Sequence, residues 1–118
     1  MVVDGQQHGG VAHGIGNALF EEVVYDDAGQ MLNPTFMDYL LPTAADVPPI
    51  QVEHETHLSP LNPLGIKGAG EGGAVSPPAA IANAIVDALR PLEIEMAEMP
   101  MTPARVWRAI RAATSNGG

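Results

Sequence analysis

Residues 75–89 combine a nearly continuous apolar run with two polar positions four residues apart, Asn83 and Asp87. Pro77 and Pro78 stand near its start, where a helix has no intrahelical partners for its N–H groups in any case. Polar positions at i and i+4 make one narrow stripe on a helix. The pattern therefore predicts a helix over 75–89 that is buried on most of its sides.

Two more helices are predicted, one near each end of the chain. The first covers residues 4–22, and its interior glycines Gly14 and Gly16 each cost about 1 kcal/mol relative to alanine. Glycines in such positions suggest that another segment packs closely against the helix. Near the other end, Thr102 is suited to an N-cap and Pro103 to the first helical position, which predicts a terminal helix.

Three segments predict β-structure. The turn 26–29, which ends in glycine, separates the short apolar runs 22–25 and 30–32 and indicates a hairpin. Residues 50–56 and 92–96 alternate apolar and polar positions, as half-exposed strands do. The fold class expected is α+β, with a short hairpin, two further strands and about three helices.

Composition limits the size and setting of the fold. A chain of 118 residues forms one domain at most, and 13 glycines with 11 prolines predict that loops dominate. There is no cysteine, which rules out disulfides and thiolate metal sites and fits a cytoplasmic protein. No stretch has the length and apolarity of a membrane span, and the first residues do not resemble a signal peptide.

The net charge of −9 is unevenly distributed. Residues 1–89 carry eleven acids against Lys67 alone, whereas Arg105, Arg108 and Arg111 lie in the predicted terminal helix. Because binding to phosphate backbones requires a basic face, nucleic acid is excluded as an expected partner.

A glycine-rich loop over residues 65–73 surrounds one acid, Glu71, with five glycines. Glycines let a ligand approach the main chain, so Glu71 could face a ligand or a reacting group; the alternative is a surface turn whose carboxylate points into water. The loop also leads into the N-terminus of a predicted helix, where free N–H groups and the helix dipole favour an anion. Lys67 is the one cation nearby.

The same loop formally contains a dinucleotide-binding fingerprint at Gly68, Gly70 and Gly73. That motif requires a hydrophobic strand immediately before it, and Pro60 and Pro63 exclude a central strand there. The Rossmann interpretation is therefore rejected.

The histidines do not have the spacing of a metal site. His54 and His57 would lie on opposite faces of a strand, and His8 and His13 are five apart in the sequence with two glycines between them. We expect no protein-ligated metal and interpret these histidines as surface groups or as supports for other side chains. No serine stands in a nucleophile-elbow context either.

Five short motifs are informative as an ordered set. They are Gly5-Gln6-x-x-Gly9-Gly10, Gly14-Ile15-Gly16-x-Ala18-Leu19-x-Glu21-Glu22, Asp38-Tyr39-x-x-Pro42, Lys67-Gly68-x-Gly70-Glu71 and Met101-Thr102-Pro103-x-Arg105-Val106. Together they resemble the C-terminal part of the molybdopterin-binding large subunit of molybdenum hydroxylases, the family of xanthine dehydrogenase, aldehyde oxidase and aerobic carbon monoxide dehydrogenase. The resemblance covers residues 2–113, and residues 36–44 resemble the carbon monoxide dehydrogenase-like group most.

The resemblance implies a role for several residues. Glu71 matches the family's general base, which accepts a proton as oxygen attacks an electron-poor substrate carbon. Gln6 matches a glutamine that hydrogen-bonds the molybdopterin cofactor, expected in its cytosine dinucleotide form, and Lys67, Gly68 and Gly70 would be cofactor neighbours. The cofactor's dithiolene holds the metal, so the chain itself would supply no metal ligand.

The resemblance also implies that this chain is a small share of a subunit. Residues 1–113 would be a partial molybdopterin-binding domain and residues 114–118 a disordered tail. The expected partners are the remainder of the large subunit, an FAD-binding medium subunit, an iron-sulfur small subunit and a small-molecule substrate, and the isolated chain would be inactive. The alternative is a standalone acidic domain that binds an anion or a partner without catalysis.

Overall fold

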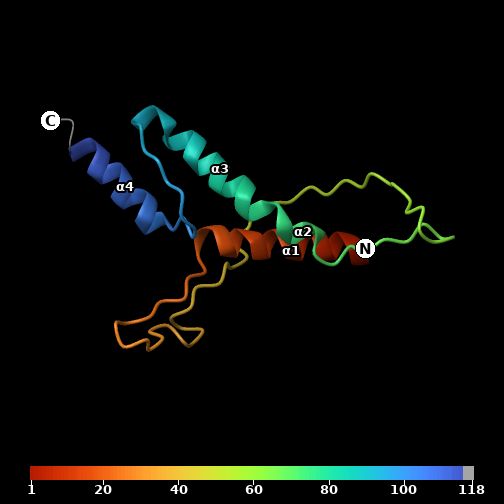
Figure 1. Ribbon diagram of the computed structural model, residues 1–118, viewed down its shortest axis with the longest axis horizontal. Coiled ribbons are helices and arrows are strands. Elements are labelled where there is room, and N and C mark those ends of the chain that lie inside the picture. The colour runs from red at the N-terminus through yellow and green to blue at the C-terminus, as the bar shows by residue number, and fades with distance from the viewer. Residues whose placement is uncertain (116–118) are drawn as a thin grey trace.

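The computed structural model describes residues 1–115, and within them it is helical. The elements are α1 (Val2–Leu19), α2 (Gly72–Val75), α3 (Pro77–Leu89), a 3-10 turn (Arg90–Leu92) and α4 (Pro103–Ser115). Figure 1 shows α1 at the centre with α2 and α3 beside it, while two long loops leave this group in different directions. The three predicted helices are thus present, although the one predicted over 75–89 begins at Pro77 as α3.

Glycines on α1 allow the close contact that joins α1 to α2 and α3. A Cβ added at Gly10 would lie 2.7 Å from the backbone carbon of Gly73, and one at Gly14 would lie 2.7 Å from the Cβ of Pro77. Real side chains do not approach to such distances, so any larger residue at either position would force the helices apart. The expectation of close packing at the mid-helix glycines is confirmed for Gly14.

The start of α4 is attached to the end of α1. The Met101 N–H donates to the carbonyl oxygen of Ala18 at 2.7 Å, and both residues are buried. Arg105 forms an ion pair with the Glu22 carboxylate. Thr102 caps α4 as predicted, because its Oγ1 accepts the Arg105 N–H at 3.2 Å.

Tyr39 fastens the first long loop to the same end of α1. Its hydroxyl donates to Oε2 of Glu21 at 2.7 Å. This bond to an anionic acceptor favours the protonated phenol and raises the pKa of Tyr39 above its ordinary 10.0. The stabilisation is therefore fully present below pH 10.0 and is lost as the pH rises through the higher folded-state pKa.

The predicted β-structure is wrong, and so is the α+β class. Residues 50–56 and 92–96 form no strand, and the predicted hairpin retains only a single antiparallel bridge between Tyr25 and Met31. Alternation shows which side chains could face a core, but a strand also requires a neighbouring strand to accept its hydrogen bonds. Within the described residues no such neighbour lies beside either segment.

The turn inside the predicted hairpin is nevertheless well formed. The carboxylate of Asp26 accepts the N–H groups of Ala28 and Gln30 at 2.9 and 2.8 Å. Gly29 adopts a φ of +79°, a conformation that glycine reaches without steric cost. Sequence reasoning therefore located the turn correctly and overestimated the length of the ladder that follows from it.

The prediction that the alanine-rich helix is buried on most sides is also wrong for this chain. Leu89 is the one buried residue of α3. Among residues 1–115 the hydrophobic core contains four buried side chains, those of Ile15, Ala18, Leu89 and Met101. The radius of gyration is 18.5 Å, whereas a compact domain of this length has about 13 to 14 Å. The apolar residues along one side of α3 are half-buried, so this helix is covered in part and not on most of its sides.

Of the predicted disordered tail at 114–118, the first two residues belong to α4. The rest of that prediction, residues 116–118, lies outside the described residues.

Candidate functional site

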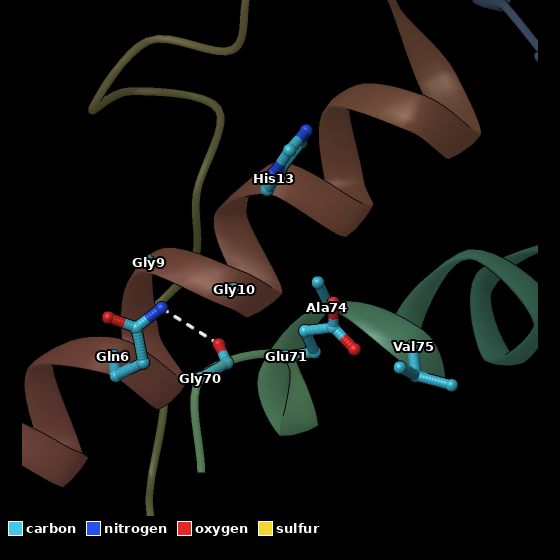
Figure 2. A pocket seen from close by; sticks show the side chains of 8 residues that line it. All are labelled: Gln6, Gly9, Gly10, His13, Gly70, Glu71, Ala74 and Val75. Carbon is cyan, nitrogen blue, oxygen red and sulfur yellow. Dashed lines mark hydrogen bonds between the residues drawn. The ribbon is translucent and has the colours of Figure 1, made fainter. Parts of the chain in front are cut away.

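A pocket of about 500 Å³ lies where α1 meets α2 and the end of the glycine-rich loop. Figure 2 shows the side chains that line it, with α1 on one side and α2 on the other. The lining residues are Gln6, Gly9, Gly10, His13, Gly70, Glu71, Ala74 and Val75. Three of the five residues predicted for the site, Gln6, Gly70 and Glu71, therefore meet at one pocket.

Gln6 connects the two sides of the pocket. Its Nε2 donates to the carbonyl oxygen of Gly70 at 2.8 Å, across 64 positions of sequence. The side chain remains exposed, so its Oε1 and its second N–H are free to bind a further group. The bond fixes the glycine-rich loop against the first turns of α1 and brings Glu71, the next residue, to the pocket.

Glu71 occupies the N-cap position of α2, and its backbone carbonyl accepts the Ala74 N–H at 2.9 Å. Its side chain caps no helix N–H, and no hydrogen bond or ion pair to it occurs within residues 1–115. In α2, the second residue after Glu71 must be glycine, because a Cβ at Gly73 would lie 2.7 Å from the carbonyl oxygen of Gln7. Packing against α1 thus positions the backbone at Glu71 and leaves its carboxylate available.

The other two predicted site residues are not brought to this pocket. Lys67 and Gly68 are exposed and do not line it. They follow a tight turn built on Asn62, whose amide exchanges two hydrogen bonds of 2.9 Å with the backbone of Ile66. That turn directs the chain but leaves the side chain of Lys67 outside the pocket.

The expectation of an anion site at a helix N-terminus is not supported by this geometry. The loop feeds α2, a single turn of four residues, and the long helix α3 begins only after Ser76. No lysine or arginine lines the pocket. The pocket therefore suits a group that accepts and donates hydrogen bonds better than it suits a phosphate.

Sequence reasoning missed His13 as a pocket residue. It lies on α1 seven positions after Gln6, and the stripe formed by Gln6, Gly9, Gly10 and His13 has the spacing i, i+3, i+4 and i+7. Residues at that spacing share one face of a helix. The signal was therefore present once the role of Gln6 had been recognised.

Two further searches concern metals and membranes. No group of three or more histidine, cysteine, aspartate or glutamate residues within 1–115 is arranged to hold a metal ion. The helices of the same residues are all too short or too polar to cross a bilayer.

Comparison with known proteins decides the family. Residues 1–48 match a family model described as a molybdopterin cofactor-binding domain. The nicotine 6-hydroxylase large subunit of Paenarthrobacter nicotinovorans is 44% identical over 110 residues, which are 93% of this chain and 14% of that protein. The chain belongs to the molybdenum hydroxylase large-subunit family.

Two more members of the molybdenum hydroxylase family match over nearly the same span. The carbon monoxide dehydrogenase large chain of Hydrogenophaga pseudoflava is 35% identical over 94% of this chain and 14% of its own length. The crystal structure of quinoline 2-oxidoreductase from Pseudomonas putida 86 has a TM-score of 0.89 at 50% identity, covering 94% of this chain and 14% of that one. The family resemblance drawn from the motifs is thus confirmed. This chain spans about one seventh of the length of these relatives.

Proposed function

We propose that this chain forms one wall of a molybdopterin site in a molybdenum hydroxylase large subunit and supplies its general base, Glu71. The observation that carries the proposal is the meeting of Gln6, Gly70 and Glu71 at one pocket. These residues come from segments 64 positions apart, and the fold joins them through a hydrogen bond rather than by sequence proximity.

The residues of the pocket fit the pterin and metal end of such a cofactor. No atom lies within 4 Å of the position that a Cβ would take at Gly9 or Gly70, so a flat ring system can reach the backbone there. Gln6 offers an amide donor and acceptor to the heteroatoms of such a ring. Because no lysine or arginine lines the pocket, the phosphate end of the cofactor would be held elsewhere in the subunit.

The proposed chemistry divides between the cofactor and the chain. When bound, molybdopterin with its metal supplies a two-electron redox centre and the oxygen that is transferred. Glu71 accepts a proton from the attacking oxygen, which makes that oxygen a stronger nucleophile toward the substrate carbon. Its carboxylate is free for this task because no described side chain pairs with it. The substrate would be an aldehyde, an N-heterocycle or a similar small molecule.

Exposed apolar surface supports assembly into a larger subunit. Phe36, Met37 and Leu61 are 88%, 93% and 92% exposed, and burying such large apolar side chains against further protein would be favourable. The proposed assembly contains the remainder of the large subunit, an FAD-binding medium subunit and an iron-sulfur small subunit. We further propose the cytosine dinucleotide form of the cofactor and a cytoplasmic location. A standalone acidic domain would leave this apolar surface and the expanded shape unexplained.

The role of Gln6 is tested in the full-length large subunit produced with its partner subunits. Gln6→Ala removes the bond to Gly70 and the proposed contact with the pterin, so we expect a severalfold lower molybdenum content per subunit. Metal analysis of the purified enzyme measures this directly. Gln30→Ala, which removes a glutamine from the turn near Tyr25, serves as the matched control and should keep the wild-type metal content. Equal molybdenum in all three proteins would contradict the proposed contact.

A further inference from the structure

His13 differs from the other three histidines of the chain. His8 lies between the carbonyl oxygens of Asp4 and Ile50, His54 pairs with Asp4, and His57 pairs with Glu55. His13 has no hydrogen-bond or ion-pair partner within residues 1–115, and it is exposed. It also lines the pocket that contains Glu71. A polar ring that lines a pocket and has no partner among these residues is available to a ligand.

The order of contacts along α1 places His13 on the opposite side of Glu71 from Gln6. Gln6 bonds Gly70, Gly10 packs against Gly73, and Gly14 packs against Pro77, so the segment 70–77 runs beside α1 in the same direction. Along the axis of α1, Glu71 therefore lies between Gln6 and Gly10. His13 lies seven residues beyond Gln6, about 10 Å further along the helix axis.

The two ends of the pocket therefore differ in chemistry. The end at Gln6 is polar and carries the proposed cofactor contact. At the other end, Ala74 and Val75 of α2 supply apolar surface, and His13 supplies one hydrogen-bonding ring. Such an end suits a small, largely apolar molecule with a single polar heteroatom.

From this arrangement, and resting on the proposed function, we propose that His13 contacts the substrate and determines specificity by hydrogen-bonding the ring nitrogen of an aromatic N-heterocycle. Glu71 and His13 would then act on the same molecule, the first on the proton of the attacking oxygen and the second on the heteroatom. A site that binds a heteroatom in this way discriminates against the analogue that lacks it, because the polar group of the site is left unpaired.

The proposal is tested by binding to the assembled, cofactor-loaded enzyme, with quinoline and naphthalene as probes of nearly equal shape. We expect His13→Leu to weaken quinoline binding about tenfold and to leave naphthalene binding within about twofold, as the loss of one hydrogen bond predicts. His13→Gln keeps a hydrogen-bonding group and should retain most of the quinoline affinity. Equal effects on the two probes, or no measurable binding of quinoline to the wild type, would overturn the proposal.

A second measurement covers the case in which the leucine variant fails to assemble. Diethyl pyrocarbonate should modify His13 in the wild-type enzyme, and quinoline should slow that modification more than naphthalene does, as followed by peptide mass spectrometry. An unreactive His13, or equal protection by both probes, would refute the assignment. Neither readout depends on turnover, so this inference can fail while Glu71 remains the general base, and the base assignment can fail separately.

Discussion

Replacing Glu71 by glutamine in the assembled enzyme should lower turnover by ~10² to 10⁴-fold, the range that loss of a general base produces. Glutamine keeps the size of the side chain and can still form hydrogen bonds, but it cannot accept a proton at neutral pH. Because Gln6 and the backbone of the glycine-rich loop are unchanged, the molybdenum content should stay close to that of the wild type. Steady-state kinetics with parallel metal analysis measures both quantities.

The matched control is Glu53→Gln, which makes the same chemical change at an exposed carboxylate that does not line the pocket. It should leave turnover and metal content near their wild-type values. If Glu71→Gln retained more than about a tenth of the wild-type turnover, the loss would fall below even the low end of the range for a general base. Glu71 would then be assigned a structural or binding role.

Gly10→Ala should be strongly damaging for a change that adds a single methyl group. The added Cβ would lie 2.7 Å from the Gly73 backbone, and neither helix has a flexible side chain there that could yield. We expect a destabilisation of about 1–3 kcal/mol from overpacking. The shift of α2 should also displace Glu71, and a displacement of about 1 Å at a reacting group can cost ~10²-fold in rate.

Gly5→Ala provides the control because it makes the same substitution on the same helix. No atom lies within 4 Å of a Cβ at Gly5, and that residue does not line the pocket. Alanine there should be neutral or should stabilise α1 by up to about 1 kcal/mol. Thermal unfolding and turnover of the two variants give the comparison. Similar behaviour of Gly10→Ala and Gly5→Ala would show that the contact between α1 and α2 does not position Glu71.

The features that local sequence determines were predictable. Thr102 and Pro103 specify the start of α4 through cap chemistry, and the mid-helix Gly14 indicated a close contact that the structure shows with Pro77. The turn that ends at Gly29 was located for the same reason, since a positive φ strongly favours glycine. For the cap and the turn the physical cause lies within a few residues of the signal, whereas at Gly14 the glycine indicated a close contact without indicating its partner, Pro77.

Features that require a particular packing partner were not predictable. Residues 50–56 alternate as a strand would, yet no neighbouring strand completes a ladder within the described residues. The apolar sides of α3 indicated burial, but its one buried residue is Leu89. A periodic pattern shows which face a segment can bury, whereas the partner that buries it is a property of the whole assembly.

The candidate site was predicted only in part, because its composition depends on how distant segments meet. Gln6 and Glu71 came from the motifs, and the bond from Gln6 to Gly70 gives their association a physical basis. His13 was missed because its significance depends on that association: only when Gln6 faces the pocket does the residue two turns later face it too. Lys67 was expected near the cofactor from its place in the motif that ends at Glu71, and it lies outside the pocket, after the turn at Asn62.

The central claim is that Glu71 acts as the general base beside the cofactor. Its most direct test is the distance from the Glu71 carboxylate to the reacting centre in a crystal structure of the assembled, cofactor-loaded enzyme. The account predicts an oxygen within hydrogen-bond reach of that centre, about 2.6–3.2 Å or one water molecule away, with the Gln6 amide against the pterin. A cofactor bound elsewhere in the subunit, with Glu71 facing solvent or another protein segment, would contradict it.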